Sequence, residues 1–272
     1  MKTLRLIGIG AGHLGHITVD AIRALNQTDV FFVLDKGEAA ADLRHMREAV
    51  CAQFIEVPMF RTVVATDPVR RRLGGSYRED VEAWHRARAD IFERLLRDEL
   101  AEGESGAFLV WGDPSLYDST LRIVDQVVAR GTIDLTVEVI PGISSVQVLA
   151  ARHGIALHAI GGSVQITTGR HLARGWPVGV DDLVVMLDGN CTFAEIDPAG
   201  VDIYWGAYLG TDDEILISGP LAERAEQIEQ VRSAARAEKG WIFDIYLLRR
   251  TGKPPAATPD PSHARGDVDA RA

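Results

Sequence analysis

Four glycines near the N-terminus form the part of this sequence whose residue types and spacing most clearly suggest chemistry. Gly8, Gly10, Gly12 and Gly15 follow a short apolar run and precede a segment whose apolar residues recur at helical spacing. Glycine allows positive φ angles and lets the backbone approach a ligand closely, where a Cβ would block it. The stretch therefore predicts a nucleotide-like ligand at a strand-to-helix turn.

The ligand class remains open on these residues alone. Gly10, Gly12 and Gly15 also satisfy the G-x-G-x-x-G pattern of dinucleotide-binding turns, and Asp35 ends the next apolar run where a ribose-binding carboxylate belongs. An NAD(P)-dependent oxidoreductase is the leading interpretation of this stretch. A turn that only packs a helix against a strand is the alternative.

Two further loops carry small polar residues directly after predicted strands. Residues 107–111 form a predicted strand that runs into Gly-Asp-Pro-Ser-Leu-Tyr at 112–117, and residues 135–140 run into Pro-Gly-Ile-Ser-Ser at 141–145. Open α/β sheets bind ligands beyond the carboxyl ends of their strands. Three such loops on one sheet predict a shared site, and an oxidoreductase leaves the last two without a function.

Composition and charge limit the function classes. The 272 residues are 46% hydrophobic and 25% charged with a formal net charge of -10, as in a globular protein of one large or two modest domains. This charge argues against nucleic-acid binding and means that an anionic substrate needs locally concentrated cations. Our candidates for binding such a substrate are Lys36, Arg70, Arg71 and Arg72. The three arginines lie within residues 61–77, a segment that shows no regular helix or strand pattern. A solvated loop is the alternative for each arginine.

The cysteines and the apolar runs indicate the cellular compartment of the protein. Cys51 and Cys191 are far apart and lack C-x-x-C spacing or a nearby histidine pair, so the sequence suggests neither a disulfide framework nor a metal site. The glycine turn interrupts the first apolar stretch before a signal-peptide core forms, and no apolar run has the length of a membrane span. We expect a cytoplasmic protein without membrane or nucleic-acid partners.

The loops must be positioned by the strands and helices around them, and predicted strands and helices alternate along the first part of the chain. This alternation predicts an α/β fold with a parallel sheet and right-handed crossovers. The expected strands are 4–7, 29–34, 54–57, 107–111 and 135–140, and the expected helices are 18–25, 38–50, 79–102, 120–130 and 145–152.

The pattern changes at the Gly-Gly pair 161–162. Beyond it come short predicted strands at 164–168, 183–187, 201–205, 214–218 and 241–248, and a single long helical pattern at 222–238. We therefore expect two domains. The first is an N-terminal parallel-sheet α/β domain at 1–161, and the second is a C-terminal mixed-sheet α+β domain at 162–252 that completes the cleft in which the ligand binds. The proline-rich tail at 253–272 is expected to be disordered.

Taken together, four motifs resemble the tetrapyrrole methylase family. These motifs are the glycine turn at 8–12, the Gly-Asp-Pro loop with the tyrosine that follows it at 112–117, the loop at 141–145, and Met-Leu-Asp-Gly at 186–189, in the order of the family and over about residues 3–250. The resemblance implies two α/β domains that bind S-adenosylmethionine in the cleft between them, a polycarboxylate tetrapyrrole substrate and a homodimer. Ala11 departs from the usual proline, which removes some rigidity but no functional atom.

A second set of residues narrows the resemblance. Residues 33–39 with 42–43, and Tyr77-Arg78 leading to Trp84-His85, resemble the branch of the family in cobalamin biosynthesis that methylates precorrin-5 at ring carbon C1 and releases the C20 acetyl group as acetate, giving precorrin-6A. Methylation at another position of a precorrin is the first alternative. The oxidoreductase comes after it, followed by a binding protein without catalytic activity.

The resemblance also implies residue roles. Methyl transfer from a sulfonium requires mainly positioning in a water-poor cleft. The positions that match the cofactor-lining residues of the family are Ala11, Gly112, Asp113, Leu116, Ser144, Ser145, Met186, Leu187 and, as a weaker match, Ala207.

Release of acetate makes a different demand, because water must attack the acetyl carbonyl with help from a general base or oxyanion donors. His13, Asp35 and Tyr117 are the candidate catalytic residues by placement, with His171 as a further candidate. The sequence does not separate them.

Overall fold

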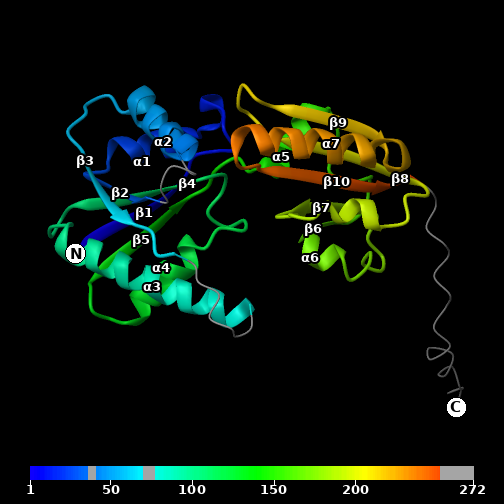
Figure 1. Ribbon diagram of the computed structural model, residues 1–272. Coiled ribbons are helices and arrows are strands. Elements are labelled where there is room, and N and C mark those ends of the chain that lie inside the picture. The colour runs from blue at the N-terminus through cyan, green and yellow to red at the C-terminus, as the bar shows by residue number, and fades with distance from the viewer. Residues whose placement is uncertain (36–40, 70–76, 252–272) are drawn as a thin grey trace, which may run out of the picture.

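The computed structural model describes residues 1–35, 41–69 and 77–251 of the chain, and two five-stranded sheets dominate it (Figure 1). Lys36, Arg70, Arg71 and Arg72, our candidates for the substrate site, lie outside the described residues, as does the tail at 253–272. Of the helices in the described part, none combines the length and apolarity that a membrane crossing needs.

The first sheet is built from parallel strand pairs, which confirms the expected α/β architecture. Its strand order is β3-β2-β4-β1-β5. The strands are β1 (Lys2–Gly8), β2 (Val30–Asp35), β3 (Arg61–Thr66), β4 (Ser105–Val110) and β5 (Leu135–Ile140). The helices that follow them are α1 (Val19–Asn26), α2 (Ala41–Phe54), α3 (Tyr77–Asp98), α4 (Thr120–Ala129) and α5 (Ser145–His153).

Both faces of this sheet are covered. Successive side chains of a strand point to opposite faces, so Phe32 packs with Phe92 and Phe108 in one core while its neighbour Phe31 packs with Leu25 in another. The first core lies under α3 and α4, and the second lies under α1 and α2. A central strand of such a sheet has no face toward solvent, and all six residues of β4 are buried.

One strand was wrongly predicted. Residues 54–57 do not form a strand, because α2 continues to Phe54, whose carbonyl accepts a hydrogen bond from Asn26. The strand is instead β3, within the segment that we expected to be irregular. β3 lies at the edge of the sheet, where its residues are exposed or only partly buried, so it lacks the continuous apolar run of a central strand.

The second sheet is mixed, as expected. Its order is β6-β7-β10-β8-β9, with β6 parallel to β7 and the remaining pairs antiparallel. The strands are β6 (Val164–Thr168), β7 (Asp182–Met186), β8 (Val201–Ala207), β9 (Ile215–Pro220) and β10 (Asp244–Arg250), and the helices are α6 (Gly169–Leu172) and α7 (Leu221–Lys239).

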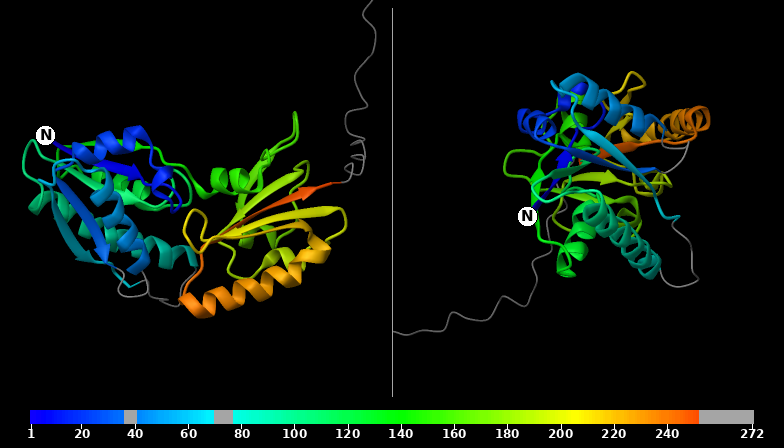
Figure 2. Two further views of the ribbon diagram at one scale, coloured as in Figure 1. Left: turned by 90° about the horizontal axis from the view of Figure 1, so that it is seen from above. Right: turned by 90° about the vertical axis from the view of Figure 1, so that its left-hand side faces the viewer.

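Helices α5 and α7 cover opposite faces of the second sheet (Figure 2). Ile228 of α7 packs with Trp205 and Tyr246, whereas Leu149 of α5 packs with Leu247. Helix α5 follows the last strand of the first sheet in sequence but packs on the second. The start of α5 is therefore carried to the junction of the two sheets.

Candidate active site between the two sheets

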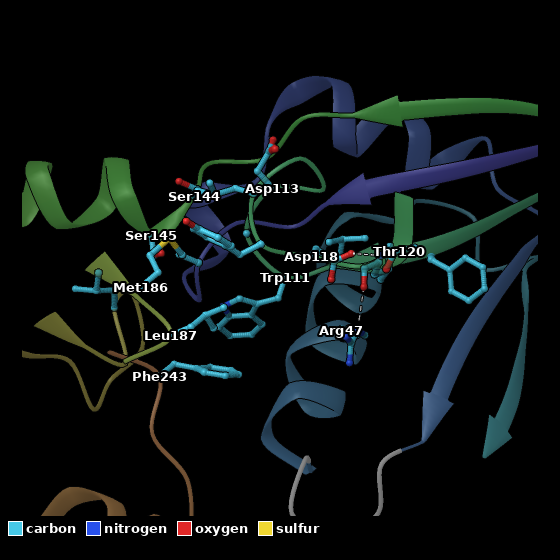
Figure 3. Close-up of a pocket in the computed structure, with 18 of the residues that line it drawn as sticks. Arg47, Trp111, Asp113, Asp118, Thr120, Ser144, Ser145, Met186, Leu187 and Phe243 are labelled. Atoms are coloured by element: carbon cyan, nitrogen blue, oxygen red, sulfur yellow. Dashed lines mark hydrogen bonds between the residues drawn. The ribbon is translucent and has the colours of Figure 1, made fainter. Parts of the chain in front are cut away.

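A cavity of about 290 Å³ lies where loops from the two sheets meet (Figure 3). Loops after β1, β4 and β5 form one part of its wall, because the order β4-β1-β5 places the carboxyl ends of these strands side by side. Loops after β7 and β8 and the start of β10 form the other part. The three loops singled out in the sequence thus line one cavity.

Glycine is required where these loops touch. Gly10 and Gly112 pair through two backbone hydrogen bonds of 2.8 and 3.3 Å. A Cβ on Gly8 would lie 2.5 Å from the backbone nitrogen of Gly142, and a Cβ on Gly142 would lie 2.1 Å from the carbonyl oxygen of Gly112. Any side chain at Gly8 or Gly142 would therefore push the loops apart.

Asp113 fastens two of the loops together. One carboxylate oxygen accepts a 2.9 Å hydrogen bond from the backbone N–H of Gly142, and the other accepts bonds from the backbone N–H and the hydroxyl of Ser115. Burial opposes ionisation of this carboxyl group, but the hydrogen bonds from Ser115 and Gly142 outweigh it and hold the pKa of Asp113 below its ordinary value.

Ser144 caps the N-terminus of α5 at the edge of the cavity. Its hydroxyl accepts a 3.2 Å hydrogen bond from the N–H of Val146, and the side chain of Gln147 accepts one from the N–H of Ser144, which completes a capping box. The N-terminal end of a helix carries partial positive charge. Ser144 and Ser145 therefore present a polar, electropositive edge to the cavity.

Backbone strain is concentrated around the cavity. Four described residues other than glycine have positive φ, and three of them, Tyr117 at 51°, Leu187 at 54° and Tyr208 at 49°, line the cavity. Large side chains rarely adopt this conformation, and it persists only where the surroundings enforce it. Such outliers gather at functional sites, which supports the assignment of this cavity as the site.

The cofactor-lining residues predicted from the sequence gather at this cavity with one exception. Ala207 does not line it, whereas the residues that follow, Tyr208 and Leu209, do. The predicted residues that line it are Ala11, Gly112, Asp113, Leu116, Ser144, Ser145, Met186 and Leu187.

The predicted catalytic residues are scattered. Tyr117 lines the cavity, and its hydroxyl lies 3.5 Å from the carbonyl oxygen of Ile166 on the second sheet. His13, Asp35 and His171 do not line it. His13 is exposed, and its Nδ1 accepts a 2.9 Å hydrogen bond from the N–H of Gly15 within the 3-10 turn η1 (Leu14–His16).

The candidate oxidoreductase residues lack the arrangement that a dinucleotide site requires. Asp35 pairs with Arg44, with 3.6 Å between their side-chain atoms. Helix α1 begins at Val19 behind its cap Thr18, so Gly15 lies in the preceding turn rather than at the start of the helix.

The cavity also contains charged and aromatic residues that sequence patterns do not single out. Arg88 of α3 is buried in a bidentate pair with Asp67 and stacks on Trp84. Arg47 of α2 donates a 3.1 Å hydrogen bond to the carbonyl of Leu109, and burial lowers its pKa despite the opposing charge of Asp118. Both arginines occupy mid-helix positions with no motif around them. Trp111, Asp118 and Phe243 are further charged or aromatic lining residues.

The fold and the cavity define a class: a two-sheet α/β protein with a small-molecule site at the carboxyl ends of parallel strands, closed by loops of a mixed sheet. The chain belongs to the tetrapyrrole (corrin/porphyrin) methylases, because the sequence profile of that family matches residues 3–225. It is therefore a methyltransferase, and the oxidoreductase alternative is not favoured.

Two similar proteins indicate to which branch of the family the chain is most similar. It is 50% identical to precorrin-6A synthase (deacetylating) from Sinorhizobium sp over 250 residues, 92% of this chain and 96% of that protein. The crystal structure of a cobalamin synthesis related protein (CobF) from Corynebacterium diphtheriae matches with a TM-score of 0.81 and 36% identity, over 93% of this chain and all of that one.

A more distant structure shares the fold. Uroporphyrin-III C-methyl transferase from Thermus thermophilus, complexed with S-adenosyl homocysteine, matches with a TM-score of 0.56 and 18% identity over 92% of each chain. Tetrapyrrole methylases use S-adenosylmethionine as the methyl donor.

Proposed function

We propose that this protein methylates precorrin-5 at ring carbon C1 with S-adenosylmethionine and releases the C20 acetyl group as acetate, giving precorrin-6A. The observation that carries this proposal is the 50% identity to precorrin-6A synthase (deacetylating), which extends over 92% of this chain and 96% of the relative. The match thus extends over nearly the full length of both proteins.

We assign the cofactor to the part of the cavity between the glycine loops and the second sheet. When bound there, S-adenosylmethionine supplies an activated methyl group, so the protein has mainly to orient it and to exclude water. Leu116, Met186, Leu187 and Leu209 provide an apolar lining, and Asp113 keeps two loops in register rather than contributing a reactive group.

The mouth of the cavity suits a large, flat substrate. Tyr117, Leu187 and Phe243 line the cavity and yet are 43%, 64% and 46% exposed. Exposed apolar side chains grouped around a cavity mark a binding surface. Arg47 adds a positive charge on the side of the first sheet, and Lys36, Arg70, Arg71 and Arg72 stay our proposed contacts for the substrate carboxylates.

The proposal is tested by incubating the purified protein with methyl-labelled S-adenosylmethionine and either precorrin-5 or a precorrin from an earlier methylation step. Label should enter precorrin-5, with one acetate released for each methyl group transferred, and the earlier precorrin should remain unlabelled. Transfer to the earlier precorrin alone would support the alternative position of methylation. The homodimer and the cytoplasmic location stay predictions, the former checked by light scattering.

A further inference from the structure

Acetate release requires a proton acceptor for the attacking water, and the described residues of the cavity wall offer few. Three of its described lining residues are carboxylates: Asp113, Asp118 and Asp244. Asp113 is occupied by its contacts with Gly142 and Ser115. Asp244 accepts hydrogen bonds of 2.8 Å from Arg232 and 3.1 Å from Trp205 Nε1, so it belongs to a packed network behind the cavity wall.

Asp118 differs from these two. One carboxylate oxygen accepts a 2.6 Å hydrogen bond from the N–H of Thr120 at the start of α4, and the side chain is only partly buried. Figure 3 places Asp118, Thr120 and Arg47 on the side of the cavity that the first sheet forms, opposite Met186 and Leu187. The carboxylate thus faces the part of the cavity that we leave to the substrate.

Arg47 provides a cation on the same side. Its Nε is held by the carbonyl of Leu109, which fixes the guanidinium plane in the cavity wall. Burial lowers the pKa of Arg47, and the negative charge of Asp118 acts against this shift, so Asp118 lies close enough to act on the guanidinium from the same wall of the cavity. A carboxylate and a guanidinium on one wall can take a proton from water and stabilise a developing oxyanion, respectively.

We propose that Asp118 is the general base and Arg47 the oxyanion donor for release of the acetyl group. This inference rests on the proposed function. It replaces the candidates His13 and Asp35, which do not line the cavity, while burial raises the pKa of Tyr117 and leaves it a protonated phenol at neutral pH.

Atoms and electrons balance in this step. Water attacks the acetyl carbonyl carbon and gives its proton to Asp118, while the carbonyl oxygen becomes an oxyanion beside Arg47. Collapse of this intermediate breaks the carbon–carbon bond to the macrocycle and releases acetic acid, which ionises. The electron pair of the broken bond stays with the macrocycle and compensates for the methyl group that arrives without its bonding pair. Asp118 returns the proton to solvent.

Asp118→Asn tests the base, because the amide oxygen can still accept the bond from Thr120 and preserve the start of α4. Its affinity for S-adenosylhomocysteine should stay within about twofold of the wild type, and methyl transfer to precorrin-5 should persist. Acetate release should fall by about 10²–10⁴-fold, the usual contribution of a general base. Asp125→Asn, which removes an exposed carboxylate from α4, the helix that follows Asp118, is the matched control and should change neither rate.

The second pair of variants tests the oxyanion donor. Arg47→Gln should slow acetate release by about 10²–10³-fold, and Arg47→Lys, which keeps the charge, should restore part of the rate. Formate added to Asp118→Ala should likewise restore part of its acetate release. Acetate release at the wild-type rate in Asp118→Asn, or equal loss of methyl transfer and acetate release, would overturn the assignment. Wild-type protein that releases no acetate from precorrin-5 would instead refute the proposed function itself.

Discussion

The hydroxyl of Tyr246 donates a 2.6 Å hydrogen bond to the carboxylate of Asp188, directly behind the cavity-lining Leu187. Asp188 also accepts bonds from the N–H and the hydroxyl of Thr192, and Arg232 donates to its backbone carbonyl. Both Asp188 and Tyr246 are buried. This network holds the chain immediately after Leu187, whose positive φ needs such support.

Tyr246→Phe should therefore lower the free energy of unfolding by about 1–3 kcal/mol, because the buried carboxylate loses a hydrogen-bond donor. Affinity for S-adenosylhomocysteine should also fall, since Leu187 lines the cavity. Tyr204→Phe on the same sheet is the matched control, because no described hydrogen bond involves its hydroxyl. Thermal unfolding with and without the ligand measures both effects, and equal behaviour of the two variants would contradict the role of the network.

Asp113 should make stability depend on pH. Its pKa is below the ordinary value in the folded protein, so its contribution is present above the unfolded pKa of about 4 and is lost as pH falls through the folded pKa. The stability difference between wild type and Asp113→Ala should be largest near neutrality and should shrink below about pH 4. Ser115→Ala, which removes one donor, should show a smaller effect of the same sign. A difference that grows with acidification would rule out this account.

Gly142→Ala should abolish cofactor binding, because the added Cβ would lie 2.1 Å from the carbonyl oxygen of Gly112 and must separate the loops. Gly131→Ala is the control: its φ of 65° makes alanine cost about 1–2 kcal/mol, yet nothing lies within 4 Å of the added atom. Calorimetry with S-adenosylhomocysteine should detect binding by Gly131→Ala alone. Normal binding by Gly142→Ala would show that close contact of the loops is not required.

The arginines at 70–72 lie outside the described residues, so their role is tested directly in solution. Because the protein carries a net charge of -10, a polycarboxylate substrate needs a local positive field. Replacing Arg70, Arg71 and Arg72 by Gln should raise the KM for precorrin-5 and weaken its dependence on salt, while affinity for S-adenosylhomocysteine stays unchanged. An unaltered KM would show that these arginines are only exposed to solvent and do not contact the substrate.

Local signals account for the parts of the site that could be predicted from the sequence. Gly8, Gly112 and Gly142 are recognisable because glycine at or just beyond the end of an apolar run is typical of a turn at the end of a strand, and strand order then brings the three loops together. The positions around them followed from the family resemblance. The sheets were predictable because their central strands are continuous apolar runs.

The rest depended on tertiary structure. Arg47 stands in no recognisable motif, and Asp118 directly follows the loop at 112–117 without a role that the loop pattern assigns. Only the packing of α2 against β4 and the turn before α4 bring the two residues to one wall of the cavity. Edge strand β3 was not predicted, because its strand conformation depends on pairing with β2 rather than on an apolar pattern of its own. His13 is a natural candidate beside the glycines, but the 3-10 turn directs it away from the cavity-lining set.

The most direct test of the proposed reaction is to locate the new methyl group. Precorrin-5 should be converted with ¹³C-methyl S-adenosylmethionine, and the products followed by NMR spectroscopy. We predict a single ¹³C methyl signal assigned to ring carbon C1, loss of the C20 acetyl group and one equivalent of acetate. A labelled methyl group at any other ring carbon, or no transfer at all, would contradict the proposed function.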